Sequence, residues 1–277
     1  MVTLHEGDCI EVLQTIAPES VDMVFADPPF NAGKEYADEF DDKLPLAEYR
    51  AWLTKWIEQA ERALKQGGTF WLMQDQRHLG YCQMELERLG LEFRNIVSWA
   101  YTNPTPASDG FPKTWRPILL FSKGKPNTFD WHADQMGRET LYYNPGRAKT
   151  NFPNDLWPDI PKLVGGIFAP PELLRTREGR FAHLAQMPEK LADRAVRIAT
   201  LPGEIVLDPF MGSGTVGAAC KKIGRRYIGI EKSHVYFAMA EKRIKKSALQ
   251  PSLFTPSNIA STGQERADSA APVLFQS

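Results

Sequence analysis

Four consecutive residues have the side chains needed to activate an amine. Asp27, Pro28, Pro29 and Phe30 directly follow the continuously apolar run Val21–Ala26. The amine of a nucleobase is a poor nucleophile because its lone pair is delocalised into the ring. A carboxylate on Asp27 and the carbonyl of Pro28 could each accept one amine hydrogen, and the prolines would hold both acceptors rigidly. Phe30 could stack on an extruded base; the structural alternative is a strand-end turn with a helix-capping acid.

A glycine-rich segment, Leu207–Gly217, forms a second candidate site. Its glycines allow a tight turn and a close approach of the backbone to a ligand, and Glu231 follows Gly212 by 19 residues. An acid at that distance, at the end of the next predicted strand, can accept hydrogen bonds from both hydroxyls of a ribose. The glycine spacing also fits a dinucleotide-binding loop. The segment alone therefore leaves open a nicotinamide cofactor, S-adenosylmethionine or a plain glycine turn.

Hydrophobic spacing predicts strands alternating with helices around both segments. The predicted strands are Val2–Leu4, Val21–Ala26, Thr69–Met73, Phe93–Tyr101, Trp115–Phe121, Glu204–Leu207 and Tyr227–Ile230. The predicted helices are Leu46–Leu64 with a stop at Gly67-Gly68, Arg77–Leu89, Pro188–Thr200, Ser213–Ile223 and Ser233–Lys246. This alternation predicts an α/β fold, a Rossmann-like parallel sheet covered on both faces.

The alternation is interrupted once and then ends before the C-terminus. Residues 102–180 are rich in proline and glycine and have weak hydrophobic periodicity, which predicts an irregular insert. It would separate a first part, residues 1–101, from a second, residues 181–250. The tail at 251–277 is rich in Ser, Ala and Pro and is expected to be disordered. The polar segment Asn31–Lys43 is expected to be a mobile loop.

Composition narrows the class of protein. The 277 residues carry a formal net charge of −1, but residues 1–60 hold 13 acids and 4 bases, whereas residues 160–250 hold 16 bases and 8 acids. A basic face for a polyanion is compatible with this asymmetry. No apolar run approaches the length of a membrane helix, and the N-terminus lacks the features of a signal peptide. Three widely separated cysteines make disulfides and a thiolate zinc site unexpected. A soluble cytoplasmic protein without a metal is the prediction.

Taken in order, the motifs resemble those of the β group of amino-methylating DNA methyltransferases. The opening His5-Glu6-Gly7-Asp8-Cys9, the segment Asp22–Asn31 and the later Leu207–Gly217 are similar to that group, in which the catalytic tetrapeptide precedes the glycine loop. Ser98–Pro106, Arg116–Gly124 and Asp155-Leu156-Trp157 fit as well. The resemblance covers roughly residues 1–125 and 155–246. It implies S-adenosylmethionine as cofactor, with 102–180 as a target-recognition insert.

The resemblance also implies roles for individual residues. Asp27, Pro28, Pro29 and Phe30 would hold the target base. Asp8 would bind the adenine amine of the cofactor and Glu231 its ribose, while Asp208 and the glycine loop would shape the pocket for its methionine part. The cofactor-binding residues implied in this way are Asp8, Cys9, His183, Gln186, Asp208, Pro209, Phe210, Gly212, Ser213, Gly214, Thr215, Glu231 and Lys232.

The sequence departs from the group where His183-Leu184-Ala185-Gln186-Met187-Pro188 replaces a His-Pro-Thr-Gln-Lys-Pro segment. The contacts of that lysine are in doubt because position 187 is methionine. Backbone amides or Thr215 are the expected substitutes that would hold the methionine carboxylate of the cofactor.

The resemblance implies the N6 amine of adenine in duplex DNA as the substrate, because cytosine-N4 enzymes more often begin the tetrapeptide with serine. Cytosine-N4 methylation is the nearest alternative; a nicotinamide-dependent dehydrogenase and a catalytically inactive DNA-binding module are alternatives of other classes. A homodimer and a cognate restriction endonuclease are further expectations. Candidate contacts to DNA phosphates or guanines are Lys113, Arg116, Lys123, Lys125, Arg138, Arg147, Lys149, Arg175, Arg177 and Arg180.

Overall fold

The computed structural model describes residues 1–33, 42–105, 110–134, 154–163, 172, 174 and 186–248. Eight strands form one sheet: β1 (Val2–Glu6), β2 (Val21–Ala26), β3 (Leu64–Met73), β4 (Glu92–Thr105), β5 (Lys113–Ser122), β6 (Leu156–Trp157), β7 (Ile205–Asp208) and β8 (Arg226–Glu231). Six helices accompany them: α1 (Cys9–Thr15), α2 (Leu46–Ala63), α3 (Leu79–Arg88), α4 (Glu189–Ala199), α5 (Thr215–Lys222) and α6 (His234–Lys246). In this part of the chain, no helix has the length and apolarity needed to span a membrane.

The strand order is β1-β8-β7-β2-β3-β5-β4-β6. The five strands from β1 to β3 are parallel to one another, whereas β5 runs antiparallel to both β3 and β4. The predicted α/β, Rossmann-like class is therefore confirmed, with an antiparallel hairpin added at one side. Both β5 and β6 lie within residues 102–180, so this range contributes strands to the main sheet. The boundaries of a target-recognition insert stay a prediction.

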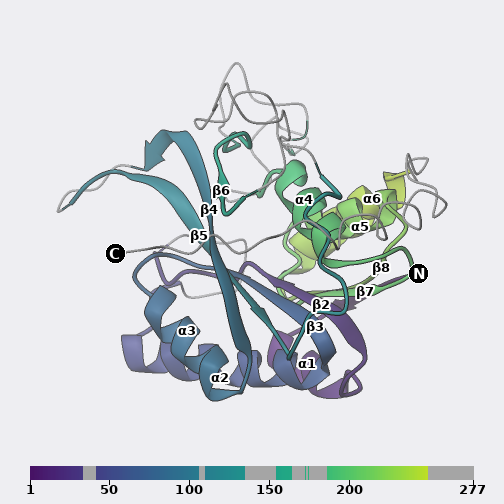
Figure 1. The fold of residues 1–277 in the computed structure, drawn as a ribbon, viewed down its shortest axis with the longest axis horizontal. Helices are drawn as coiled ribbons and strands as arrows, with labels where there is room; N and C mark the ends of the chain where they lie inside the picture. The colour runs from purple at the N-terminus through teal and green to yellow at the C-terminus, as the bar shows by residue number, and fades with distance from the viewer. Residues whose placement is uncertain are drawn as a thin grey trace, which may run out of the picture.

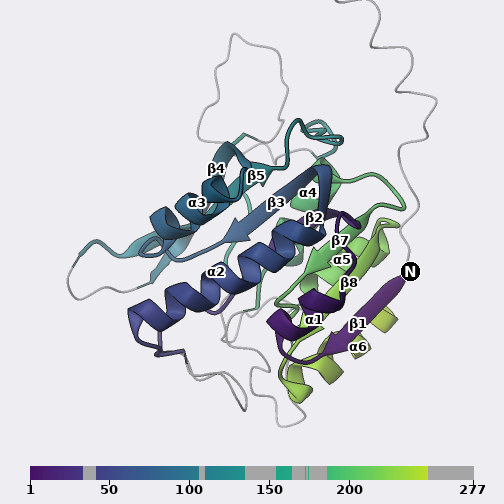
Figure 2. The same cartoon turned by 90° about the horizontal axis from the view of Figure 1, so that it is seen from below.

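Three helices cover each face of the sheet. Figures 1 and 2 show α1, α2 and α3 on one face and α4, α5 and α6 on the other. The central strand β2 serves both layers, since Met23 and Phe25 belong to one buried apolar cluster and Val24 and Ala26 to the other. A central parallel strand needs apolar residues on both faces, which is why β2 has an uninterrupted apolar sequence.

The predicted helix stop at Gly67-Gly68 lies instead inside β3. Helix α2 ends at Ala63 and β3 begins at the next residue, with a register shift against β2 before Thr69. Gly67 has a φ of +78°, and a Cβ there would lie 2.3 Å from the side-chain amide of Asn127. The glycines therefore permit an irregular strand that packs against the turn after β5, and the helix ends without them.

The helices that follow β2 and β7 lie on opposite faces of the sheet. After β2 the chain enters α2 on one face, whereas after β7 it enters α5 on the other. Because β7 and β2 are neighbours in the sheet, the two connections diverge at their carboxyl ends. Ligands of open α/β sheets bind at such a point.

Candidate active site

Both predicted motifs meet at the carboxyl ends of β2 and β7. Val24 of β2 pairs with Leu207 of β7, so Asp27 and Phe210 each come three residues after this pair. The negative charge of Asp27 also raises the pKa of Asp208, a sign that the two carboxylates are close. Residues 183 apart in the sequence are thus assembled into one site by a single strand pairing.

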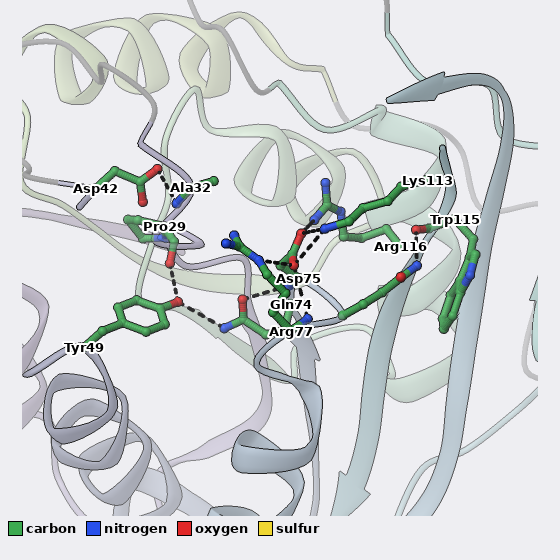
Figure 3. A network of polar contacts seen from close by, with 11 residues as sticks. Pro29, Ala32, Asp42, Tyr49, Gln74, Asp75, Arg77, Lys113, Trp115 and Arg116 are labelled. Atoms are coloured by element: carbon green, nitrogen blue, oxygen red, sulfur yellow. Dashed lines mark hydrogen bonds and ion pairs between the residues drawn. The ribbon is translucent and has the colours of Figure 1, made fainter. Parts of the chain in front are cut away.

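The tetrapeptide turn is fixed from outside by hydrogen bonds. Tyr49 on α2 donates its hydroxyl to the Pro29 carbonyl at 2.6 Å, and Gln74 donates to the Tyr49 hydroxyl at 3.3 Å (Figure 3). Asn31 adopts a φ of +54° and exchanges two hydrogen bonds with the Leu44 backbone. The carbonyl of Pro28 therefore belongs to a backbone with little freedom, as the chemistry inferred from the sequence requires.

Phe30 is buried under an arginine. Its ring is 7% exposed, and the Arg116 guanidinium carbon lies 4.4 Å from the ring centre. Arg116 belongs to β5, so the antiparallel hairpin contributes a side chain that contacts the tetrapeptide. Because so little of Phe30 is exposed, a base could stack on its ring only after a covering side chain such as Arg116 has moved.

Asp208 is a buried carboxyl group with an unusual pKa. Burial, together with the negative charges of Asp27 and Glu231, raises its pKa from 3.8 to about 7, although Tyr227 and the Phe210 amide both donate hydrogen bonds to it. Those bonds favour the ionised form but do not outweigh desolvation. A nearby cation would stabilise its ionised form, so this part of the site suits a positively charged ligand.

Glu231 is prepared to accept hydroxyl groups. Its two oxygens each receive one backbone hydrogen bond, from Gly212 at 2.8 Å and from Ser233 at 2.8 Å. A carboxylate oxygen has a further lone pair, so each could accept a second donor such as a ribose hydroxyl. This arrangement suits the ribose of an adenosyl cofactor, which is the group that Glu231 is predicted to bind.

Two residues predicted to bind the cofactor, Asp8 and Phe210, also make contacts within the protein. Asp8 caps α1 through the Ile10 amide at 2.9 Å, and the Lys232 ammonium lies 4.0 Å from its other oxygen. Phe210 packs against the rings of Trp52 and Trp56, with ring centres 5.6 and 5.0 Å away. These contacts fix the positions of Asp8 and Phe210; their binding roles stay predictions, as does that of the adjoining Pro209.

Two glycines of the loop are required by helix packing. A Cβ on Gly214 would lie 2.9 Å from the Ala240 backbone of α6, and one on Gly217 would lie 2.5 Å from Ile244. Gly214 also has a φ of +77°. The spacing that resembled a dinucleotide-binding pattern is thus explained at these positions by contact between α5 and α6.

An arginine far along the sequence reaches the glycine loop. Arg243 of α6 donates to the Thr215 hydroxyl at 2.7 Å and to Ser213 at 3.4 Å, and burial lowers its pKa. The Thr215 hydroxyl also donates to the Met187 carbonyl at 3.4 Å. Helical periodicity gave no reason to choose Arg243 over its basic neighbours, and only the packing of α6 against α5 shows its position.

The remaining residues predicted to bind the cofactor or DNA make other contacts or lie outside the described residues. The side chain of Gln186 bonds to the backbones of Glu172 and Leu174, so it holds that segment. Cys9, like the other two cysteines, is buried, and burial raises the pKa of its thiol. Among the described residues no group of three or more His, Cys, Asp or Glu side chains could hold a metal ion. Outside the described residues lie His183, Arg138, Arg147, Lys149, Arg175, Arg177 and Arg180.

Four of the predicted DNA contacts are described: Lys113, Arg116, Lys123 and Lys125. Lys123 pairs with Glu61 of α2 at 2.9 Å. Lys113 and Arg116 lie beside the tetrapeptide. Both bind the carboxylate of Asp75, which follows β3, at 2.8 Å and 3.3 Å (Figure 3). Arg77 binds the same carboxylate at 2.9 Å. Sequence reasoning missed Asp75 and Arg77 because their meeting with the start of β5 depends on the antiparallel pairing of β3 and β5.

Comparison with known proteins agrees with this geometry. The DNA methylase family of N6 and N4 enzymes matches residues 21–242. The type II methyltransferase M.HinfI of Haemophilus influenzae is 33% identical over an alignment of 267 positions, which covers 90% of this chain and 70% of that protein. M.HpaI of Haemophilus parainfluenzae is 31% identical over 86% of this chain and 72% of its own.

Solved structures show the same fold. The complex of M1.HpyAVI with S-adenosylmethionine superposes with a TM-score of 0.59 at 25% identity, over 88% of this chain and 99% of that one. The cytosine-N4-specific PvuII DNA methyltransferase gives a TM-score of 0.68 at 20% identity, over 94% and 90% of the two chains. The predicted fold, enzyme class and cofactor are confirmed, and the dehydrogenase alternative is removed. The chain belongs to the N6/N4 family of DNA methylases, which use S-adenosylmethionine to methylate DNA.

Proposed function

We propose that this enzyme methylates the N6 amine of adenine in duplex DNA after the base has been flipped out of the helix. The observation that supports this proposal most is the rigid Asp27–Phe30 turn beside the buried carboxyl of Asp208. An Asp at the first position offers a carboxylate to an amine hydrogen. The flip itself costs about a few kcal/mol, which contacts to the DNA would offset.

In this mechanism the residues of the chain orient rather than react. S-adenosylmethionine, when bound, supplies a methyl group that is already electrophilic because it is attached to a sulfonium. Asp27 and the Pro28 carbonyl each accept one hydrogen bond from the amine, so the nitrogen lone pair is free and directed. The proton that the nitrogen loses on methylation passes to the Asp27 carboxylate and from there to solvent. Phe30 supports the ring of the base, and the Tyr49 bond to Pro29 at 2.6 Å keeps the turn from relaxing. Most of the rate gain comes from this positioning.

The residues available for the cofactor match its parts. Glu231 presents two carboxylate oxygens to a ribose, and Asp8 at the start of α1 is assigned to the adenine amine. Asp208 and Asp27 would provide negative charge near the sulfonium of the cofactor. Without a nearby cation, the repulsion between the two carboxylates disfavours ionisation of Asp208. Ser213, Gly212 and the backbone around them would surround the methionine part.

A labelling experiment tests the base. The protein is incubated with tritiated S-adenosylmethionine and duplex DNA, and the DNA is digested to nucleosides and separated. The label is expected on N6-methyladenine. Label on N4-methylcytosine would replace our proposal with the cytosine alternative, which the shared fold with the PvuII enzyme makes the relevant comparison.

Further properties follow from the relatives and stay proposals. M.HinfI and M.HpaI are named type II methyltransferases, which supports a restriction-modification role with a cognate endonuclease. We also propose that the enzyme acts in the cytoplasm and forms a homodimer. Cleavage protection of methylated DNA and sedimentation of the protein would test the endonuclease partner and the dimer.

A further inference from the structure

We propose that Arg77, Lys113 and Arg116, gathered around Asp75, bind a DNA phosphate next to the flipped nucleotide. This inference rests on the proposed function, because it requires a DNA substrate whose target base enters beside Phe30. The sequence offered phosphate or guanine as a ligand of Lys113 and Arg116; the structure adds Arg77 and Asp75 to them and favours the phosphate.

The cluster has an excess of positive charge. Three cationic side chains surround one carboxylate, with distances to Asp75 of 2.9 Å from Arg77, 2.8 Å from Lys113 and 3.3 Å from Arg116. Burial opposes ionisation of Asp75, but the bonds from Lys113 and Arg77 hold its pKa well below its usual range. The carboxylate is therefore charged at neutral pH, and one further anion is needed even to approach balance.

The shared carboxylate is buried, whereas the cations around it are exposed to different degrees. The Asp75 side chain is 7% exposed, whereas those of Arg116, Lys113 and Arg77 are 17%, 30% and 53% exposed. Guanidinium and ammonium groups have more N–H donors than one carboxylate can accept. An oxyanion at the surface would find several donors already oriented, without the loss of side-chain entropy that free lysines would suffer.

The location points to a phosphate close to the target base. Arg116 contacts both Asp75 and the face of the Phe30 ring, so the cluster borders the tetrapeptide. A chain of hydrogen bonds also joins them: the Asp75 amide donates to Gln74, Gln74 to Tyr49, and Tyr49 to Pro29 (Figure 3). A phosphate held here would be held in a fixed position relative to the turn that grips the amine.

A phosphate fits these side chains better than a guanine does. Reading guanine requires an arginine or lysine that projects freely and places two bonds on one base edge. Here the guanidinium of Arg116 lies over Phe30, and all three cations converge on one carboxylate. They are thus committed to one place, which suits contacts that position the backbone and carry no sequence information.

The test combines Lys113→Ala and Arg77→Ala with neutral phosphates in the DNA. Duplexes carry a single methylphosphonate at one of the phosphates on either side of the target adenine. Each variant is expected to raise KM for ordinary DNA about tenfold and to lower the dependence of log KM on log salt by about 0.9. At one methylphosphonate position the wild type should lose a similar factor, and the variants should lose nothing more.

Arg88→Ala is the matched control. Arg88 also lies in an ion-pair cluster, with Glu58 and Glu85, but at the far end of α3 from the tetrapeptide. Its removal should change neither KM nor the salt dependence. Lys113→Arg, which keeps the charge, should recover most of the affinity, and cofactor binding and thermal stability show that each variant is folded.

Two results would overturn the phosphate site. One is an unchanged KM in both alanine variants; the other is a loss that multiplies with the methylphosphonate loss at every position. Either could occur while the wild type methylates adenine normally. Absence of any labelled base in the wild type would instead contradict the proposed function.

Discussion

Two carboxyl groups on either side of β2 are almost equally buried yet differ in charge. Asp208 at the end of β7 is 2% exposed and Asp75 after β3 is 5% exposed. Asp208 lies near the acids Asp27 and Glu231, and its pKa is raised to about 7. Asp75 lies among cations, and its pKa is lowered. Burial raises the pKa of both carboxyl groups and is the largest cause at Asp208, whereas the cations bonded to Asp75 outweigh it there.

The two sides of the site differ in charge and therefore suit ligands of opposite charge. The side of β7 and β8 has an excess of carboxylates, which suits a cofactor with a sulfonium. The side of β3 and β5 has an excess of cations, which suits a nucleic acid backbone. The tetrapeptide at the end of β2 lies between them, where a methyl donor from one side can meet an amine from the other.

The sharpest test removes the group between the two sides. Asp27→Ala should lower kcat about a thousandfold, because the amine loses one of the acceptors that orient its lone pair. Cofactor affinity, measured by titration calorimetry, should change little. Asp22→Ala is the control: Asp22 lies on the same strand but pairs with Lys65 at 2.6 Å, and its loss should leave kcat intact. A comparable fall in kcat for Asp22→Ala would remove the special role of Asp27.

Replacing each flanking acid by its amide should change stability in opposite directions. Asp75→Asn should lower the free energy of unfolding by about 3 kcal/mol, because three clustered cations lose the carboxylate that they share. Asp208→Asn should raise it at pH 8, because the pKa of Asp208 is higher in the folded state. That carboxyl opposes folding increasingly from its ordinary value of 3.8 up to about 7, and by a constant amount above.

Urea denaturation at pH 8 and at pH 5 measures both effects. The gain from Asp208→Asn should shrink at pH 5, where the folded wild type holds a proton on Asp208. The loss from Asp75→Asn should persist, because Asp75 remains ionised at pH 5. Changes of the same sign in the two variants at pH 8 would contradict the contrast between these carboxyl groups.

Sequence reasoning succeeded where the signal is local. Continuous apolar runs predicted β2 and β7, and the acids at their carboxyl ends, Asp27 and Asp208, meet because parallel strands align these ends. Tertiary pairings were inaccessible. Arg116 reaches Asp75 only through the register of β5 on β3, and Arg243 reaches Thr215 only through the packing of α6 on α5.

Glycines illustrate the same limit. Gly67-Gly68 was predicted to end a helix, yet it permits an irregular strand beside Asn127. Gly214 was assigned to cofactor binding from its loop, yet a Cβ added there would meet Ala240, 26 residues later. A glycine pattern states that space or a positive φ is required; the partner that needs the space is set by the fold.

Gly214→Ala should therefore destabilise the protein even without cofactor. Its added Cβ would lie 2.9 Å from the Ala240 backbone, and its φ of +77° is unfavourable for alanine, so a loss of about 2 kcal/mol is expected. Gly224→Ala is the matched control, since Gly224 has a φ of +74° but nothing within 4 Å of its Cβ. It should lose only about 1 kcal/mol in thermal or urea denaturation. Equal losses would leave the backbone angle as the whole cause.

The smallest expected effect concerns cofactor affinity and pH. A bound sulfonium should stabilise the ionised form of Asp208, so binding below pH 7 must release a proton. Affinity for S-adenosylmethionine should then rise about tenfold between pH 6 and pH 8 and level off above. Asp208→Asn cannot ionise and should give a flatter profile, measured by calorimetry across the same range. Because Glu231 also has a raised pKa, Glu231→Gln is the necessary comparison: a slope that disappears only in that variant would move the cation-sensing group from β7 to β8.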